Sequence, residues 1–210
     1  MRRRRLLAKS ARMRAGAGRR FLSAIAGIME LARKPPRPTP EAVELRVLFV
    51  CHGNICRSAI AEGILRAKLA ETGMLGRVAV ASAGTSRENV GRRADGRARL
   101  VVRRHGTTIG DMRARKLECE DFDRFDVILV MDERNREDVV ELAPTEAAAG
   151  KVRLLLDHVG GGEIPDPVAG TWKDFEHVHA TIEQACDGLL SDITLRLSTA
   201  ASGGALSSPA

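Results

Sequence analysis

Apolar and polar positions follow a regular succession of blocks along the middle of the chain. Residues 45–50 are almost continuously apolar and of strand length, which is typical of a strand buried on both faces. A stretch with helical spacing of its apolar residues comes next, and this order of strand and helix signals recurs toward the C-terminus. We expect strands at 45–50, 77–81, 125–131 and 151–156 and helices at about 59–71, 94–104, 133–142 and 172–197.

The alternation of strands and helices predicts the fold class. It is the pattern of a parallel sheet that helices cover on both faces. We therefore expect residues 45–197 to form an α/β domain with a small, doubly wound, four-stranded parallel sheet, flavodoxin-like in type. The N-terminal extension 1–44 ends in a proline cluster and the tail 198–210 is rich in Ser, Ala and Gly, so both are predicted to be disordered.

The positive charge of the chain lies at its N-terminal end. The 210 residues carry a net charge of +7, but residues 1–44 hold twelve Lys and Arg against three Glu and so carry +9, which leaves −2 for the remainder. Aromatic residues make up 3% of the chain and Tyr is absent, whereas a nucleic-acid-binding face combines basic and aromatic side chains. We expect no nucleic-acid partner for the folded domain.

Three interpretations of the basic extension 1–44 stay open. It is poor in acidic residues, and residues 19–22 resemble a twin-arginine signal, which favours a targeting peptide. It can also make weak contacts with an anionic surface, either a membrane or a nucleic acid. The third interpretation, which we favour, is a disordered extension without a role.

Cysteine usage and hydropathy indicate the compartment. Four cysteines, Cys51, Cys56, Cys119 and Cys186, are too few for a disulfide scaffold in a chain of this size, and Cys51 and Cys56 are spaced too widely for a C-x-x-C metal pair. No segment approaches the roughly 18 uninterrupted apolar residues of a membrane span. We expect a cytoplasmic protein without a membrane span.

The most informative stretch is the octapeptide 51–58, Cys-His-Gly-Asn-Ile-Cys-Arg-Ser, which connects the first predicted strand to the first predicted helix. A loop in this position directs several backbone N–H groups and the positive end of the helix dipole at one point, which suits a phosphate. Gly53 and Asn54 are residue types that tolerate positive-φ turns. We expect phosphate to be bound by His52, Gly53, Asn54, Ile55, Cys56, Arg57 and Ser58.

Cys51 is placed to be a nucleophile. The loop amides and Arg57 surround it with positive charge, so we expect it to be a thiolate at neutral pH. Attack of the thiolate on phosphorus splits hydrolysis into transfer to sulfur and transfer to water, while Arg57 grips two phosphoryl oxygens and Ser58 can donate its hydroxyl to the sulfur. Since Arg57 and the amides supply the positive charge, no metal ion or other cofactor is expected.

The leaving oxygen needs a proton, and Asp166 can supply it. Asp166 lies between two prolines and follows three consecutive glycines, which suits an extended and adaptable loop. By itself, Asp166 would be read as a helix cap or a turn residue. Together with Cys51, it is predicted to be the general acid, a role worth about 10² to 10⁴ in rate.

These motifs together resemble the low-molecular-weight protein-tyrosine phosphatases. The string Val-Leu-Phe-Val-Cys-x-Gly-Asn-x-Cys-Arg-Ser at residues 47–58 and the later Asp-Pro pair at 166–167 carry the resemblance, which extends over residues 45–197. It implies a phosphorylated protein as substrate, with phosphotyrosine as the phosphorylated residue. It also implies roles for Cys51 as nucleophile, Arg57 as phosphate clamp, Asp166 as acid, and Asn54 with Ser82 as a hydrogen-bonded pair that holds the loop.

The chain departs from this family at the rim of the substrate slot. Family members that accept phosphotyrosine usually have aromatic residues where this chain has Glu88 and Val168. The phosphoryl chemistry does not depend on these two positions. They leave open whether the substrate is a phosphorylated protein or a small phosphate ester.

Two other functions stay open as well. An arsenate reductase on the same scaffold would use Cys51 on arsenate, but it needs a nearby downstream cysteine pair, and residues 130–140 contain none. A catalytically weak phosphate-binding or docking module is the second alternative, because the aromatic walls are missing. Cys56 is either a reversible disulfide partner for Cys51 or a packing residue.

Overall fold

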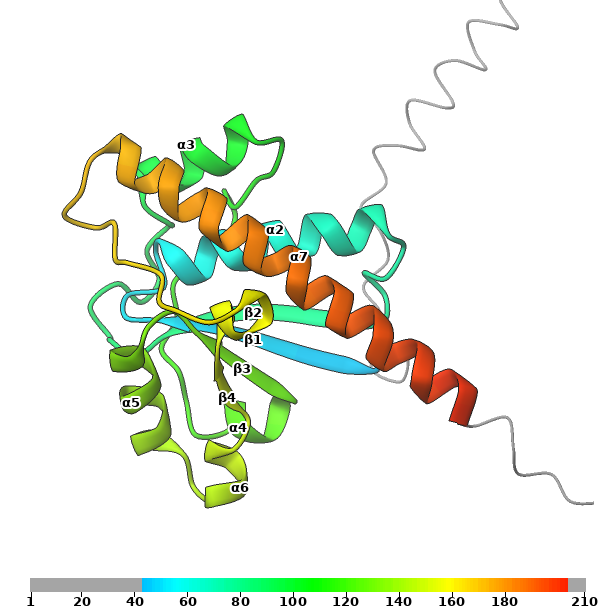
Figure 1. The fold of residues 1–210 in the computed structure, drawn as a ribbon. Coiled ribbons are helices and arrows are strands. Elements are labelled where there is room, and N and C mark those ends of the chain that lie inside the picture. The colour runs from blue at the N-terminus through cyan, green and yellow to red at the C-terminus, as the bar shows by residue number, and fades with distance from the viewer. Residues whose placement is uncertain (1–42, 204–210) are drawn as a thin grey trace, which may run out of the picture. The chain divides into compact units, whose positions relative to one another are not determined.

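The computed structural model describes residues 43–203, so the predictions for residues 1–42 and 204–210 lie outside the described residues. Within the described range, strands and helices alternate as predicted (Figure 1). The elements are β1 (Leu45–Cys51), α2 (Arg57–Glu71), β2 (Val78–Gly84), α3 (Gly96–Arg104), α4 (Asp121–Arg124), β3 (Val127–Val130), α5 (Glu133–Leu142), α6 (Glu146–Ala149), β4 (Val152–Leu154), the 3-10 helix η2 (Leu155–Val159) and α7 (Trp172–Gly203).

The four strands form one parallel sheet in the order β2-β1-β3-β4. This confirms the predicted flavodoxin-like sheet. The chain leaves β1 toward one edge to form β2, and then crosses to the other side of β1 to form β3. Ligands of such sheets bind outside the carboxyl ends of the strands, at the point where the direction of crossing reverses. Here that point lies at the end of β1, where Cys51 stands.

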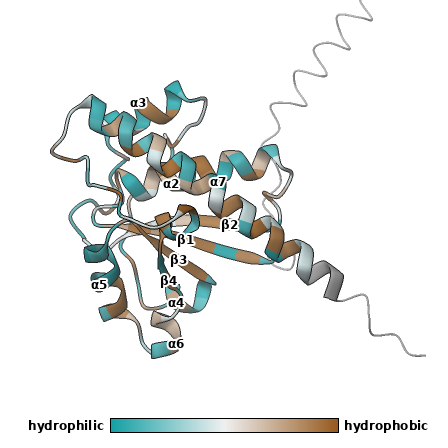
Figure 2. Cartoon of the chain, viewed as in Figure 1, coloured by the Kyte–Doolittle hydropathy of each residue, from teal (hydrophilic) through white to brown (hydrophobic). Residues whose placement is uncertain are grey.

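Helices cover both faces of the sheet, as Figure 1 shows: α2, α3 and α7 lie on one face, and α4, α5 and α6 lie on the other. The side chains of β1 alternate between two hydrophobic cores, with Val47 and Phe49 in one and Leu48 and Val50 in the other. All four side chains are fully buried, and most of β1 accordingly has the hydrophobic colour in Figure 2. Burial on both faces explains why this segment is continuously apolar rather than alternating.

Several element boundaries differ from the sequence prediction. β3 and β4 are shorter than expected, and the two four-residue helices α4 and α6 have no counterpart in the prediction. α6 begins at a local cap, where the backbone N–H of Ala148 donates to Thr145 Oγ1 at 3.1 Å. β4 ends early because the chain turns directly into η2. α7 continues to Gly203, beyond the expected end at residue 197.

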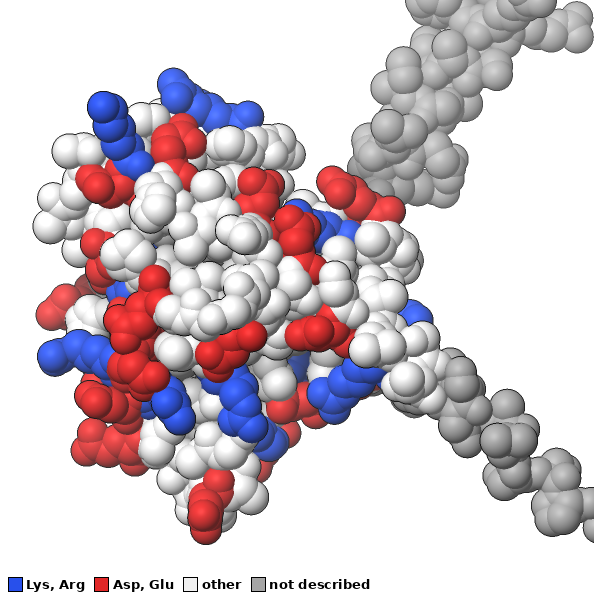
Figure 3. All heavy atoms as spheres, viewed as in Figure 1, with Lys and Arg blue, Asp and Glu red and all other residues white. Residues whose placement is uncertain are grey.

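Acidic and basic side chains are mixed over the surface of the described residues. On the face drawn in Figure 3, Lys and Arg lie among Asp and Glu side chains. This mixture fits the small net charge of the chain beyond its basic extension. No helix among the described residues combines the length and the apolar character that crossing a membrane requires.

Candidate active site

The ends of the 51–58 loop lie at the carboxyl edge of the sheet. Cys51 is the last residue of β1, and Arg57 is the first residue of α2. Both are buried, with 3% and 2% of their surface exposed. Between them, Asn54 has a φ of 53°, the left-handed turn for which Asn is one of the few suitable non-glycine residues. The loop therefore begins with a thiol, turns back on itself and ends with a guanidinium.

The Cys51 thiol contacts the hydroxyl of Ser58. Cys51 Sγ and Ser58 Oγ are 3.0 Å apart. The same hydroxyl accepts a hydrogen bond from Asn54 Nδ2 at 3.0 Å. Because a serine hydroxyl is both donor and acceptor, Ser58 can donate to the sulfur while it accepts from Asn54.

Buried hydrogen bonds hold the turn at Asn54. Its Nδ2 also donates to Ser82 Oγ at 2.8 Å, and Ser82 Oγ donates to Glu62 Oε2 at 2.8 Å. Its Oδ1 accepts the backbone N–H of Arg115 at 3.0 Å. The Asn54–Ser82 contact is the one that the sequence resemblance implied, whereas Glu62 and Arg115 are additions from the structure. A fully satisfied network of this kind makes the loop rigid.

Gly84 lets the loop pack closely against β2. It is the register partner of Cys51 in the sheet. A Cβ atom on Gly84 would lie 2.7 Å from the carbonyl oxygen of His52 and 2.9 Å from the backbone nitrogen of Asn54. Since both are backbone atoms, a side chain here would force the loop into a different shape.

Two carboxylates and a carbonyl hold the guanidinium of Arg57. Its NH1 donates to Asp132 Oδ2 at 2.5 Å and to the carbonyl oxygen of Ile164 at 2.9 Å. Its NH2 donates to Asp166 Oδ2 at 2.6 Å. Burial opposes the charged form, but Cys51 and the two carboxylates outweigh it and raise the pKa of Arg57. Arg57 is therefore a fixed positive charge beside the thiol.

Asp166 lies on residues 160–171, here called the acid loop, between η2 and α7. The three glycines at its start, residues 160–162, have φ values of 106°, 90° and 116°, which side chains other than glycine rarely allow. Arg97 of α3 fastens the far end of the loop, because its NH2 donates to the carbonyl oxygen of Val168 at 2.9 Å and its NH1 to that of Gly170 at 2.8 Å. The loop is adaptable where it begins and anchored where it ends.

The expected nucleophile, clamp and acid line one cavity of about 140 Å³. The two expected rim residues, Glu88 and Val168, lie at the same cavity. Asn54, Ser58 and Ser82 support the loop through the hydrogen bonds described above and are not among its lining residues. The lining consists of Cys51, His52, Gly53, Ile55, Cys56, Arg57, Glu88, Asn89, Asp166 and Val168.

Asn89 is the lining residue that the sequence does not predict. A Cβ atom on Gly53 would lie 2.9 Å from Asn89 Nδ2, so the amide covers this glycine closely. Asn89 Oδ1 accepts a hydrogen bond from Arg92 NH1 at 3.0 Å, which orients the amide. Its neighbours at the mouth, Glu88 and Val168, are both exposed. An amide, a carboxylate and a valine thus take the place of aromatic walls.

Cys56 lies in the same cavity wall as the expected nucleophile. Burial, with a smaller contribution from Asp95, raises the pKa of the Cys56 thiol. Cys56 therefore stays protonated at neutral pH and is a poor nucleophile there. Both Cys51 and Cys56 are free thiols in the structure.

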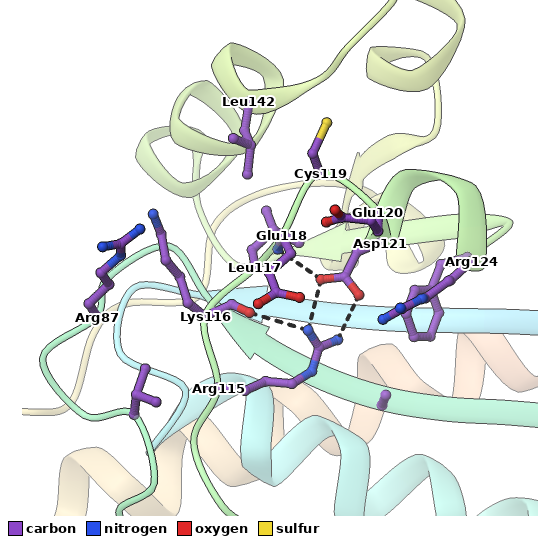
Figure 4. A pocket seen from close by; sticks show the side chains of 13 residues that line it. Arg87, Arg115, Lys116, Leu117, Glu118, Cys119, Glu120, Asp121, Arg124 and Leu142 are labelled. Carbon is purple, nitrogen blue, oxygen red and sulfur yellow. Dashed lines mark hydrogen bonds and ion pairs between the residues drawn. The ribbon is translucent and has the colours of Figure 1, made fainter.

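A larger hollow of about 980 Å³ lies elsewhere on the domain, and none of the residues 51–58 lines it (Figure 4). Figure 4 shows Arg115 reaching to Asp121, with NH1 2.8 Å from Oδ2 and NH2 3.1 Å from Oδ1. The Asp121 side chain is 1% exposed. Because the backbone N–H of Arg115 binds Asn54, this two-point ion pair braces the segment that supports the loop 51–58.

Asp132 and Arg97 also bear on the site without being predicted for it. The ion pair of Asp132 joins residues 75 positions apart, and the hydrogen bonds of Arg97 to the acid loop span more than 70 positions. Local sequence patterns therefore cannot predict these contacts. One signal was present in the sequence. Asp132 follows β3 closely, and the carboxyl ends of neighbouring parallel strands meet at one edge of the sheet.

Comparisons with known proteins agree with this geometry. Residues 46–199 match the model of the family described as low molecular weight phosphotyrosine protein phosphatase. A low molecular weight protein-tyrosine-phosphatase of Streptomyces coelicolor is 39% identical over 153 residues, which make up 70% of this chain and 93% of that protein. The crystal structure of YfkJ from Bacillus subtilis has a TM-score of 0.68 at 34% identity and covers 72% of this chain and 96% of its own. A protein tyrosine phosphatase from Entamoeba histolytica, with Hepes in the active site, has a TM-score of 0.68 at 32% identity and covers 74% and 99%.

Proposed function

The chain belongs to the low molecular weight protein-tyrosine phosphatase family, and from this premise we propose that it hydrolyses protein phosphotyrosine through a phosphocysteine formed on Cys51. The observation that carries the proposal is the presence of Cys51, Arg57 and Asp166 in one cavity. A thiol nucleophile, a fixed positive charge and a proton donor are the groups that this chemistry needs.

The reaction proceeds in two steps. Cys51 Sγ attacks phosphorus, so that the P–S bond forms while the bond from phosphorus to the ester oxygen breaks, and that oxygen takes a proton from Asp166. In the second step the Asp166 carboxylate removes a proton from water. The water oxygen attacks phosphorus, the P–S bond breaks, and inorganic phosphate and the Cys51 thiolate are released.

Arg57 is prepared for an oxyanion. Among the described residues, its Nε is one of four buried side-chain polar atoms without a hydrogen-bond partner. An unsatisfied buried donor costs about 1–3 kcal/mol, and a phosphoryl oxygen would satisfy it. Asp132 and the carbonyl of Ile164 fix the orientation of the guanidinium through its NH1. The guanidinium therefore loses little further conformational freedom when the phosphate binds.

Asp166 has to leave Arg57 in order to reach the leaving oxygen. Its Oδ2 accepts from Arg57, and its Oδ1 accepts the backbone N–H of Val168 at 3.1 Å. The glycines at 160–162 give the acid loop the backbone freedom for this short movement. The Arg57 contact keeps the carboxylate at the cavity until a phosphoryl group takes its place on the guanidinium.

Phosphotyrosine is proposed because the matched relatives are named for it. The mouth formed by Glu88, Asn89 and Val168 offers less aromatic surface to a phenyl ring than the family usually provides. A panel of phosphotyrosine, phosphoserine and phosphoarginine peptides together with small phosphate esters tests the proposed substrate. The highest kcat/KM on phosphotyrosine peptides would support it. A preference for a small ester would overturn the substrate and leave the phosphoryl chemistry in place.

No metal ion takes part in the proposed chemistry, because Arg57 and the loop amides neutralise the phosphoryl charge. We expect full turnover in the presence of a chelator. A metal requirement would contradict the role given to Arg57.

The proposed compartment is the cytoplasm, where reducing conditions keep a catalytic thiol free. Cell fractionation with an antibody against the chain tests this, and recovery in a secreted or membrane fraction would contradict it. Contact of the basic extension 1–44 with an anionic surface stays a prediction, since residues 1–42 lie outside the described residues.

Turnover of para-nitrophenyl phosphate by the wild-type chain and by Cys51→Ser is the direct test. We expect the variant to bind phosphate and to lose measurable turnover, because an alkoxide is a poor substitute for the thiolate. If both chains hydrolyse the ester equally slowly while binding phosphate, the result favours the hypothesis of a catalytically weak docking module. Arsenate reductase is not favoured, since the matched proteins are named phosphatases.

A further inference from the structure

Two histidines and a glutamate converge where the end of α3 meets α7. His105 is the residue that ends α3. His179 and Glu183 are four positions apart on α7, so they share one face of that helix. The ligand atoms of the three side chains all lie within 4.8 Å of one another. None of these residues lines the cavity around Cys51.

His179 is buried with an unsatisfied polar atom. The residue is 1% exposed, and its Nδ1 is without a hydrogen-bond partner among the described residues. That atom lies 4.0 Å from Glu183 Oε2. The distance is too long for a hydrogen bond, but the Glu183 carboxylate is the group that the Nδ1 atom faces. A buried polar atom of this kind calls for an explanation, and an ion held between the imidazole and the carboxylate provides one.

We propose that His105, His179 and Glu183 bind a divalent transition-metal ion, with Zn²⁺ as the ion that the ligand set fits best. Two imidazoles and one carboxylate form a known type of three-ligand zinc site, in which water takes the fourth position. Imidazole nitrogen favours Zn²⁺ over Mg²⁺ and Ca²⁺, which prefer oxygen ligands throughout.

The site has to contract slightly when it binds the ion. Zinc bonds of about 2.0–2.1 Å in a tetrahedral arrangement place ligand atoms about 3.3 Å apart. The His105 and His179 rings are stacked with their centroids 4.1 Å apart, so one ring must turn to bring its nitrogen to the ion. The side chains of His105 and Glu183 are 43% and 45% exposed and can make this adjustment, while buried His179 stays in place.

The surroundings favour a cation. Glu176, three positions before His179 on α7, places its Oε2 3.1 Å from His105 Nε2. A carboxylate in this position orients a ligating imidazole and adds negative charge to the site. Two neighbouring cations are already engaged. Arg104 NH1 lies 3.6 Å from Glu176 Oε1 and its guanidinium stacks 4.6 Å from the Trp172 ring, and Lys68 Nζ lies 2.5 Å from Asp187 Oδ1.

A metal ion here would join the end of α3 to the middle of α7. The ion would lie outside the proposed phosphatase chemistry, which uses none of these residues. The inference therefore does not depend on the proposed function, and its readouts are metal binding and thermal stability rather than turnover.

The test is a calorimetric titration of the full chain with Zn²⁺, carried out in a Cys51→Ser background so that the reactive thiol does not bind the ion. We expect one ion per chain. His105→Gln and Glu183→Gln alter exposed side chains and should fold, and each is expected to weaken binding by about 10- to 100-fold or more. His177→Gln, a change at an exposed histidine on the same helix, is the matched control and should bind as the parent does.

Two further measurements separate this site from others. Zn²⁺ should raise the Tm of the parent and of His177→Gln but not that of Glu183→Gln, and Mg²⁺ should raise none of them. The Co²⁺ complex should show visible bands without a thiolate charge-transfer band. Failure to bind Zn²⁺, binding by His105→Gln and Glu183→Gln as tight as that of the parent, or a thiolate band would each overturn the proposal.

Discussion

Arg57 at the start of α2 and Asp166 on the acid loop form an ion pair, with NH2 and Oδ2 2.6 Å apart. The two residues are 109 positions apart in the sequence. In the proposed mechanism Arg57 binds the phosphoryl oxygens and Asp166 protonates the leaving oxygen, so the two groups act at opposite ends of the bond that breaks. Their contact keeps the acid at the cavity until a phosphoryl group takes its place on the guanidinium.

Asp166→Asn is expected to slow the hydrolysis of esters whose leaving oxygen needs a proton more than the hydrolysis of esters whose leaving group departs as an anion. With phenyl phosphate, whose leaving group is poor, we expect kcat/KM, which reports the first step without the hydrolysis of the phosphocysteine, to fall by about 10² to 10⁴. With para-nitrophenyl phosphate the fall should be much smaller, because that phenolate leaves without help. A series of aryl phosphates measures this dependence, and Glu163→Gln on the same acid loop is the control. Equal slowing on all esters would remove Asp166 from the role of acid.

The thiols should differ in their reactivity toward iodoacetate. We expect Cys51 to be carboxymethylated first at neutral pH and inorganic phosphate to protect it. Burial raises the pKa of the Cys56 and Cys186 thiols, so both should resist the reagent. Cys119 is exposed and serves as the reference thiol within the same chain. Peptide mapping by mass spectrometry gives the order, and labelling of Cys56 ahead of Cys51, or no protection by phosphate, would contradict the assignment of the nucleophile.

The parallel sheet was predictable from the sequence, and so was the position of the loop 51–58 between β1 and α2, because both depend on local patterns. Burial of β1 on both faces requires a continuous apolar run, and residues 45–50 have it. The loop that follows combines its chemistry within eight consecutive positions, 51–58. The glycine and proline pattern around Asp166 drew attention to this residue, and the structure places it in the cavity with Cys51, while its role as acid stays a prediction.

Contacts between distant segments could not be predicted in the same way. Asp132 and Arg97 reach the site only through the packing of α5 and α3 against the sheet and α7. The helices α4 and α6 have four residues each, too few to show a helical period; α6 has a side-chain cap at Thr145, and α4 has none. His105 and His179 stack although they are 74 positions apart in sequence, so the sequence does not predict this contact. The sequence indicates only that His179 and Glu183, four positions apart, share one face of a helix.

Gly84→Ala should disturb the loop 51–58. Its new Cβ would come within 3 Å of two backbone atoms of that loop, at His52 and Asn54. We expect a loss of about 1–3 kcal/mol in the free energy of unfolding, as for overpacking elsewhere, together with a fall in kcat. Gly76→Ala is the matched control, since nothing lies within 4 Å of its Cβ position. Urea unfolding and para-nitrophenyl phosphate turnover check both variants, and wild-type behaviour of Gly84→Ala would show that the loop tolerates the contact.

The cap of α3 should give a stability contribution that depends on pH. Asp95 Oδ1 accepts the backbone N–H of Arg97 at 2.7 Å, and hydrogen bonding to the Arg97 side chain is the main cause that lowers the pKa of Asp95 below the ordinary 3.8. Since the folded pKa is depressed, the contribution is present above 3.8 and is lost as the pH falls through the folded value.

We therefore expect Asp95→Ala to cost about 1 kcal/mol in the free energy of unfolding at pH 7, as for other helix N-caps. The difference from wild type should shrink as the pH is lowered below the ordinary 3.8 and through the folded value. Urea titrations at a series of pH values measure it. A difference that stays constant over this range would show that the charge of Asp95 is not involved.

Arg97 is expected to position the acid loop without touching the substrate. One guanidinium binds the carbonyl oxygens of Val168 and Gly170 and also lies 4.4 Å from the Phe175 ring centroid, so it joins α3, the acid loop and α7. Arg97→Gln should lower kcat on poor leaving groups by about 10- to 100-fold, because misplacement of a catalytic group by about 1 Å has an effect of that size. Arg97→Lys should rescue little, since one ammonium cannot reproduce the planar fork.

A thermodynamic cycle distinguishes positioning by Arg97 from a general loss of stability. If Arg97 acts through Asp166, then Arg97→Gln should have almost no further effect on kcat in a chain that already carries Asp166→Asn. Arg103→Gln, an exposed change on the same helix, should leave kcat unchanged in both backgrounds. Should Arg97→Gln reduce kcat by the same factor with and without Asp166, its contacts would serve the stability of α3 and α7 and not the placement of the acid.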